Sequence, residues 1–332
     1  MNSGPALAGS TPPPAHAPGS VVGLDVGGTG MKGALLDHAM RSLETVRRPT
    51  PRADGPLAVV DAITDTLLTL TALAAERDLP VHHAGVVVPG IVDEGLQRAV
   101  WSANIGWRDL PLAALLTERT GLRVTLGHDV RAGGLAERAF GAARGARNVL
   151  FVAIGTGIAA ALVCDGEPVS SGGYAGELGH VVVEPGGRPC ACGGTGCLET
   201  VASATAVAAA YAERAGRPVA GAADVAALAA DDDPLARAVW QRAADGLADA
   251  LATATSMLAP ESIVLGGGLA EAGDLLLDPV RAGLERRLTF QRPPALVRAE
   301  LGDWAGCLGA GLAGWRATGH APANRRTGVP AP

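Results

Sequence analysis

Three cysteines, Cys190, Cys192 and Cys197, lie within the segment CACGGTGCLET of a chain that contains only five cysteines. In a reducing compartment, such a cluster among glycines is typical of a metal site rather than of a disulfide framework. Tetrahedral zinc needs a fourth ligand, and His180 in the preceding GELGH is the candidate. The alternative is that the cysteines are small loop residues and His180 a hydrogen-bonded core histidine, but three cysteines at this spacing favour zinc. Because a Cys3His site leaves no open position for water, the sequence predicts a structural zinc.

The residues around this cluster must bring the histidine back to the cysteines. Residues 181–190, VVVEPGGRPC, are expected to form a strand followed by a glycine turn. The other two cysteines, Cys164 and Cys307, stand in apolar segments, where a reduced thiol behaves as a small apolar side chain. Both are predicted to be packing residues.

A glycine turn occurs twice in the chain. The segments VVGLDVGGTGMKGALLDH and VLFVAIGTGIAAALVCDG each consist of an apolar run, a glycine turn and a second apolar run. Residues 28–30 of the first correspond to 155–157 of the second, which predicts two related α/β halves. Backbone N–H groups of glycine turns approach phosphate oxygens closely, so two such turns could hold the phosphates of a nucleotide, with Asp25 near their Mg2+. The alternative for either turn is a plain hairpin.

Two common nucleotide-binding patterns do not fit the first turn. Gly28, Gly30 and Gly33 match the spacing of the dinucleotide fingerprint, but that motif requires a helix after the turn, whereas MKGALLD continues as a strand. The phosphate-loop pattern fails because no Ser or Thr follows Lys32. The first turn is therefore expected to join two strands.

Elsewhere the apolar residues alternate between helical and strand spacing, which favours an α/β fold. The predicted helices cover residues 55–79, 111–121 and 234–258, and the predicted strands cover 83–90, 123–129 and the first part of 260–273. The last of these strands runs into the glycines of PESIVLGGGLAEAG.

The composition limits the partners. With 332 residues and 48% hydrophobic content the chain can bury a large core, and its length favours two domains. A net charge of −6 without a block of Lys or Arg gives no reason to expect nucleic acid or an anionic membrane as partner. The N-terminus has no basic region followed by an apolar core, and no apolar run approaches the roughly 18 residues of a membrane helix, so we expect a cytoplasmic protein. Residues 1–20 and 318–332 are predicted to be disordered tails.

Six motifs follow one another along the chain: LDVGGTGMKGALL, HD at 128–129, GTGIAAA, GELGH, CACGGTGCLE and IVLGGGLA. Their types and order resemble the ROK family of bacterial repressors, open reading frames and kinases, from about residue 21 to about residue 317. The resemblance implies a duplicated actin-like, ribonuclease H-like ATPase fold of the α/β class, with two domains around a cleft. The implied division is a small domain of residues 21–127, completed by a helix at 305–317, and a larger domain of residues 128–304 that contains the zinc segment 180–197.

For the enzymes of that family, the resemblance implies transfer of the ATP γ-phosphate to a sugar hydroxyl, usually the 6-hydroxyl of glucose or an N-acetylhexosamine. Such transfer depends mainly on positioning and charge stabilisation, with a base near the attacking hydroxyl. Asp129 matches the catalytic aspartate of the family, whereas the residues alone leave open that it caps the helix that follows. The implied sugar contacts are Asn104, His128, Asp129, Glu177, His180 and Glu199; the implied contacts of ATP and Mg2+ are Asp25, Gly27, Gly28, Thr29, Lys32, Gly155, Thr156, Gly157, Gly267 and Gly268; and the implied ligands of the structural Zn2+ are His180, Cys190, Cys192 and Cys197.

Two departures from the family pattern bear on the substrate. His128 stands where the kinases usually have Asn, and Arg131 stands where they have a small or amide residue. Because that Asn commonly contacts sugar hydroxyls, His128 changes the hydrogen bonds available beside the reacting centre. Glucokinase activity, the commonest case in the family, is the first expectation. Because of these two departures, a kinase for N-acetylmannosamine, another amino sugar or a cyclitol is the alternative.

Two alternatives without catalysis fit the sequence less well. A sugar-responsive repressor would carry a DNA-binding helix-turn-helix, but only a proline-rich segment precedes Val21. A non-catalytic sugar sensor would not need Asp25, Asp129 and Glu177 together with both glycine turns, all of which are present. The expected partner is thus a small-molecule sugar, and a homodimer or homotetramer is the general expectation for such enzymes.

Overall fold

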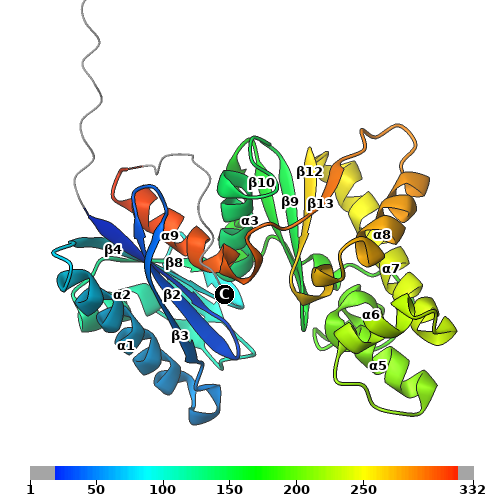
Figure 1. Ribbon diagram of the computed structural model, residues 1–332, viewed down its shortest axis with the longest axis horizontal. Coiled ribbons are helices and arrows are strands. Elements are labelled where there is room, and N and C mark those ends of the chain that lie inside the picture. Colours follow the sequence, from blue (N-terminus) through cyan, green and yellow to red (C-terminus); the bar gives the residue numbers. More distant parts are fainter. Residues whose placement is uncertain (1–18, 321–332) are drawn as a thin grey trace, which may run out of the picture.

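The structure is a computed structural model that describes residues 19–320. It contains two five-stranded sheets, each with helices packed against it (Figure 1). In the first sheet, ordered β3–β2–β1–β4–β8, β2 runs antiparallel to both of its neighbours, whereas β4 runs parallel to both of its neighbours. The strands are β1 (Ser20–Val26), β2 (Gly30–Asp37), β3 (Ser42–Pro49), β4 (Val81–Val88) and β8 (Val124–His128).

The second sheet repeats this plan in the order β11–β10–β9–β12–β13, with β10 antiparallel and β12 parallel to their neighbours. In each sheet a glycine turn joins the first two strands of the group, and the first strand lies next to the fourth. The predicted duplication of an α/β unit is therefore confirmed. The strands are β9 (Val149–Ile154), β10 (Ile158–Cys164), β11 (Glu167–Pro168), β12 (Ser262–Gly266) and β13 (Ala295–Arg298).

Helices α1 (Pro56–Ala75) and α2 (Leu112–Thr120) cover one face of the first sheet. A small antiparallel sheet of β5 (Ile91–Asp93), β6 (Arg98–Trp101) and β7 (Arg108–Leu110) lies beside them. Within residues 19–320, α1 is the one helix with the length and mean hydropathy, 1.6, of a membrane span. Its buried side chains, among them Ile63 and Leu67, pack into the core under the sheet, which is the ordinary environment of an apolar core helix.

Two helices, α3 (Asp129–Phe140) and α9 (Ala305–Ala317), pack against each other near the centre of the molecule (Figure 1). Helix α9 also lies on β1 and β4, so the last helix of the chain belongs to the core of the first sheet. The approach is close: a Cβ added at Gly85 would overlap the carbonyl oxygen of Ala310, and one at Gly309 would overlap that of Ala132. Helix α9 spans residues 305–317, the range of the helix that was predicted to complete the small domain. The division into two domains itself stays a prediction.

The second sheet is covered by a group of alanine-rich helices that surround α7. Helix α7 has the predicted bounds; it begins after Asp233, whose Oδ1 accepts the N–H of Ala236 at 2.8 Å, and has Pro234 in its first turn. The helices are α4 (Glu199–Ala202), α5 (Ala204–Ala215), α6 (Ala222–Ala230), α7 (Pro234–Leu258) and α8 (Asp274–Arg287), with short 3-10 helices η1 (Arg52–Asp54), η2 (Ser171–Gly173), η3 (Leu178–His180), η4 (Gly268–Ala272) and η5 (Gly302–Trp304).

The structure contradicts two local predictions. Residues 181–190 do not form a strand: only isolated bridges join Val182 to Cys197 and Pro189 to Thr195, because two prolines and two glycines interrupt the segment. Cys164 is exposed at the end of β10 rather than packed, whereas Cys307 is fully buried as predicted. Residues 1–18 and 321–332 of the predicted disordered tails lie outside the described residues. Ser20, predicted as the end of the first tail, is instead the buried first residue of β1.

Candidate active site and metal centre

The first glycine turn lies between β1 and β2, as predicted. The N–H of Gly27 donates to the carbonyl of Gly30 at 2.9 Å, and the hydroxyl of Thr50 donates to the carbonyl of Gly27 at 2.7 Å. Gly28 faces Asn104, since a Cβ at Gly28 would lie 3.8 Å from the Cβ of that residue. The turn is thus held by backbone bonds and brought next to a predicted sugar contact.

Lys32, on β2, contacts a distant part of the chain instead of pointing freely into solvent. Its Nζ donates to the carbonyl of Asp303 at 2.8 Å and lies 3.6 Å from the Oδ2 of the same residue. Asp303 also accepts a hydrogen bond from Arg47 at 2.9 Å. Asp303 is 271 residues away in sequence and immediately precedes α9, so this contact ties the turn-bearing hairpin to the start of that helix.

Asp25, the predicted neighbour of Mg2+, lies near the end of β1 and faces the first turn of α9: a Cβ at Gly306 would come within 2.7 Å of its Oδ2. Burial, together with repulsion from Asp129, raises the pKa of Asp25 from 3.8 to about 7, against the opposing effect of Lys32. Near neutral pH the carboxyl is therefore half protonated without a cation. A divalent cation would favour the ionised form.

Asp25→Asn is expected to stabilise the ligand-free protein more at pH 8 than at pH 5. The folded-state pKa lies above the unfolded value, so the wild type loses stability as pH rises from 3.8 through about 7, whereas Asn does not titrate. The difference in unfolding free energy should grow by about 2.6 kcal/mol between pH 5 and pH 8, measured by denaturant titration without Mg2+ or nucleotide. Asp233→Asn is the matched control, because the N–H of Ala236 lowers the pKa of Asp233. An unchanged difference would contradict the burial of the Asp25 carboxyl.

The second glycine turn joins β9 to β10 and is closed by a bond from the N–H of Gly155 to the carbonyl of Gly157 at 2.9 Å. Glu199 reaches this turn from α4: its Oε2 accepts the N–H of Ile158 at 2.8 Å. Thr156, at the tip, is exposed. Glu199, predicted as a sugar contact, is thus hydrogen-bonded to the second turn through its Oε2.

Gly267 and Gly268 lie where β12 ends, as the strand running into glycines predicts. Gly267 has a φ of +82°, and a Cβ there would lie 2.5 Å from the carbonyl oxygen of Ile154, so no other residue fits. A cavity of about 220 Å3 opens between the loop at Gly268 and the start of α6, and a second of about 390 Å3 lies between the same loop and Asp303. Gly268 and Glu271 line both cavities.

Asp129 is the first residue of α3 and follows directly on β8. The helix cap is His128, whose Nδ1 accepts the N–H of Arg131 at 3.4 Å; the alternative that Asp129 caps the helix is therefore wrong. Asp129 Oδ1 accepts the N–H of Val130 at 2.7 Å and lies 3.3 Å from the Nδ1 of His128. Burial holds the pKa of His128 below its usual value, although Asp129 opposes this effect. A neutral imidazole whose Nδ1 accepts carries its proton on Nε2.

Glu177 and His180 lie on the segment that follows η2. The Nε2 of His180 is 3.8 Å from Oε2 of Glu177, while the Nδ1 of the same ring is 3.7 Å from the Sγ of Cys190. His180 thus faces a predicted sugar contact with one nitrogen and the cysteine cluster with the other. The charge of Glu177, like that of Asp129, opposes the lowering of the pKa of His128 by burial.

The four predicted zinc ligands converge, with all ligand atoms within 4.8 Å of one another. The Sγ atoms of Cys192 and Cys197 are 3.7 Å apart. Two thiolates about 2.3 Å from a tetrahedral ion would lie roughly 3.8 Å apart, so the cluster fits zinc. Gly196 has a φ of +72°, and a Cβ there would overlap the carbonyl of Glu184; glycine thus allows the chain to fold the cysteines together.

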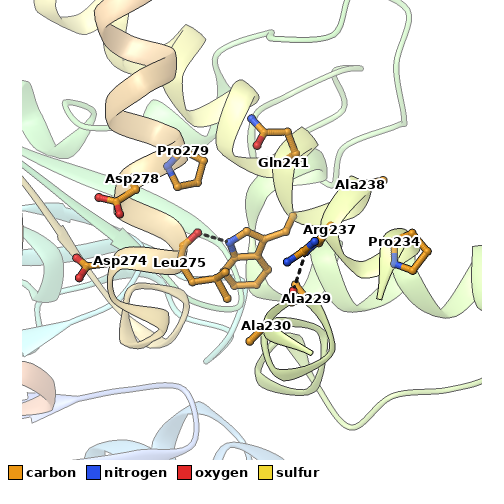
Figure 2. Close-up of a pocket in the computed structure, with 11 residues that line it drawn as sticks. Ala229, Ala230, Pro234, Arg237, Ala238, Gln241, Asp274, Leu275, Asp278 and Pro279 are labelled. Carbon is orange, nitrogen blue, oxygen red and sulfur yellow. Dashed lines mark hydrogen bonds between the residues drawn. The ribbon is translucent and has the colours of Figure 1, made fainter. Parts of the chain in front are cut away.

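A cavity of about 930 Å3 lies elsewhere, between α6, α7 and α8 (Figure 2). No predicted site residue lines it. Two of its polar side chains bond within the protein: the indole N–H of Trp240 donates to the carbonyl of Leu275 at 2.9 Å, and Nε of Arg237 donates to the carbonyl of Ala229 at 3.1 Å. Volume alone therefore does not mark it as the site of the chemistry.

Sequence analysis missed two residues near these groups, Glu94 and Asp303. Glu94 bonds to the backbone N–H of His128 at 3.1 Å and to Nε of Arg131 at 3.1 Å. No local pattern identifies Glu94, which is 34 residues from His128.

Comparison with known proteins decides the family. The sequence profile described as "ROK family" matches residues 21–313. The chain belongs to the ROK family. It is 36% identical to a glucokinase of Halalkalibacterium halodurans, over 87% of this chain and 93% of that protein, and 32% identical to an N-acetylmannosamine kinase of Salmonella arizonae, over 88% and 97%. The crystal structure of a ROK family glucokinase from Streptomyces griseus, in complex with glucose and AMPPNP, superposes with a TM-score of 0.76 at 29% identity, covering 90% of this chain and 100% of that one.

Membership confirms the actin-like ATPase fold expected for the duplicated sheets. Together with these relatives it also makes the chain a hexokinase-type sugar kinase. ATP is supported as the phosphoryl donor by the kinase relatives.

Proposed function

We propose that this ROK kinase transfers the γ-phosphate of ATP to the 6-hydroxyl of a hexose, with glucose as the first substrate and Asp129 as the base. The observation that carries the proposal is the position of Asp129: it begins α3 directly after β8, and its charge acts on both Asp25 and His128. A carboxylate at the meeting point of the two glycine-turn halves can orient the hydroxyl and accept its proton as the bond to phosphorus forms.

The nucleotide phosphates are proposed to bind the two turns through the backbone N–H groups of Gly28 and Thr29 in the first and of Thr156 and Gly157 in the second. The N–H groups of Gly27 and Gly155 close the turns instead. Mg2+, when bound, neutralises charge on the phosphates beside Asp25. Lys32 lies on β2, in the hairpin that carries the first turn. Its Nζ would exchange its contact with Asp303 for a phosphate oxygen. The cavities that share Gly268 would take the base and ribose, with Gly267 shaping the loop.

The sugar is proposed to lie among Asn104, His128, Glu177, His180 and Glu199. A site built from such groups rejects an epimer that leaves one of them unpaired. Zinc, when bound, fixes the loop of residues 180–197 and the ring of His180, which leaves Nε2 free to face the substrate side. It takes no part in the transfer.

The test is ADP release with Mg-ATP across glucose, mannose, glucosamine, N-acetylglucosamine, N-acetylmannosamine, fructose, allose and a cyclitol. Turnover that is highest with glucose is the expected result. Highest turnover with N-acetylmannosamine would instead support the alternative that the relative from Salmonella arizonae favours. No turnover with any member, for folded protein that contains zinc, would favour a non-catalytic sensor. A cytoplasmic location and a homodimer or homotetramer stay predictions.

A further inference from the structure

Arg131 is buried, with 2% of its surface exposed, and lies on the first turn of α3, two residues after Asp129. Its guanidinium makes three hydrogen bonds to groups outside the helix. Nε donates to Oε1 of Glu94 at 3.1 Å, Nη2 donates to the carbonyl of Val92 at 3.0 Å, and Nη1 donates to the carbonyl of Gly173 at 3.4 Å. One side chain therefore joins α3 to β5 and to η2.

The Glu94 partner also holds the backbone just before Asp129. Strand β8 is the edge of its sheet, so the outward backbone groups of its last residues have no neighbouring strand. Oε1 of Glu94 accepts the N–H of His128 at 3.1 Å, and the amide of Gln97 bonds both the N–H and the carbonyl of Leu126, at 2.6 and 3.2 Å. Side chains thus replace the missing strand up to the residue before Asp129.

The Gly173 partner leads to the other side of the proposed sugar site. Gly173 has a φ of +96°, and a Cβ there would lie 2.5 Å from the carbonyl oxygen of Val92, so the two carbonyls that accept from Arg131 are packed together. From Gly173 the chain reaches Glu177 within four residues. Arg131 therefore lies between the turn that carries Asp129 and the segment that carries Glu177.

We propose that Arg131 is a positioning residue, which holds the Asp129 turn and the Glu177 segment in fixed relation and thereby sets the geometry of the sugar site. The proposal rests on the proposed function, in which Asp129 and Glu177 serve the sugar. Arg131 touches no reacting atom, and it acts because a displacement of about 1 Å at a reacting group can cost about 100-fold in rate. A small or amide residue could not make the three bonds together, since only the guanidinium offers donors in a fixed fork.

Arg131→Met tests the proposal, because Met fills much of the space of the stem and removes every donor. We expect kcat/KM for the sugar to fall about 10- to 100-fold, with KM for ATP changed by less than about twofold. Arg138→Met is the matched control: Arg138 lies two turns along the same helix and donates to the carbonyl of Ala146 at 3.0 Å, away from the site. Its variant should keep the sugar kinetics. Wild-type sugar kinetics in Arg131→Met would overturn the proposal.

A second variant separates positioning from simple stability. Arg131→Met leaves the Glu94 carboxylate without its cation, and the double variant Glu94→Gln/Arg131→Met removes that unpaired charge. The double variant should regain thermal stability without regaining sugar kinetics, because the carbonyls of Val92 and Gly173 still lack a donor. Recovery of both together would show that Arg131 only stabilises the fold, and the proposal would fail.

Hydrogen–deuterium exchange tests the connection without reference to turnover. In Arg131→Met, the backbone amides of residues 91–97 and 171–177 should both exchange faster than in wild type, while those of residues 234–258 stay unchanged. Unchanged exchange in both segments would overturn the connection. A wild-type protein that turns over no sugar, or an Asp129→Asn variant that stays active, would instead count against the proposed function.

Discussion

Replacing Asp129 with Asn is expected to lower kcat for the best hexose by about 100- to 10,000-fold, the range that a general base contributes. Asn has nearly the same shape but cannot accept the proton of the sugar hydroxyl. Its side-chain oxygen can still accept the N–H of Val130, which bonds to Oδ1 of Asp129 at 2.7 Å, so the start of α3 should keep its structure. The measurement is ADP release at saturating ATP and sugar, with the sugar KM determined in parallel.

The matched control for this variant is Asp233→Asn, since Asp233 also bonds a backbone N–H at the start of a helix but caps α7, away from the proposed site. Asn is as good a helix cap as Asp, so both folding and turnover should be kept. An Asp129→Asn variant with turnover within about tenfold of wild type would contradict the assignment of the base. The base would then have to be sought elsewhere, beginning with Glu177.

The elements that sequence analysis predicted well depend on local periodicity. The two glycine turns each join antiparallel strands, and residues 234–258 form a helix with the predicted bounds, because its Asp cap and first-turn Pro are adjacent in sequence. The duplicated sheet could also be predicted, since each half repeats the same strand–turn–strand unit. Local chemistry specified these features without knowledge of the fold.

The local predictions that failed concern one segment and one helix start, where the backbone departs from regular periodicity. Residues 181–190 carry apolar residues typical of a strand, yet their prolines and glycines and the convergence of the metal ligands decide the backbone path. The alternative in which Asp129 caps α3 was wrong by one residue, because a cap requires extended backbone and His128, not Asp129, has it. Periodicity does not resolve a shift of one residue.

The contacts that no local pattern could predict join residues far apart in sequence. Arg131 and Glu94 are 37 residues apart, and Lys32 and Asp303 are 271 residues apart. Before the structure, Arg131 was only a departure from the family pattern. Its three hydrogen-bond partners are brought together only when β5 and η2 pack against α3, so its role follows from the tertiary structure alone.

Removing the metal should have the second large effect, and Cys192 is the ligand to replace. Cys192 is exposed, so Cys192→Ser removes a ligand without leaving a cavity in the core. We expect one zinc per chain in wild type and a large loss of zinc in the variant, measured by elemental analysis. At free zinc about 1,000 times its Kd, binding contributes about 4 kcal/mol to folding, so the melting temperature should fall clearly.

The sugar site should weaken with the metal, because His180 contributes one ring nitrogen to the cluster and turns the other toward Glu177. We expect the sugar KM to rise at least about tenfold in Cys192→Ser, the size of effect that follows when groups that orient a metal ligand are removed. KM for ATP should change little. Cys164→Ser is the matched control, since Cys164 is equally exposed but lies at the end of β10, outside the cluster. If zinc is lost while the sugar KM stays at the wild-type value, the metal does not orient the sugar site and serves stability alone.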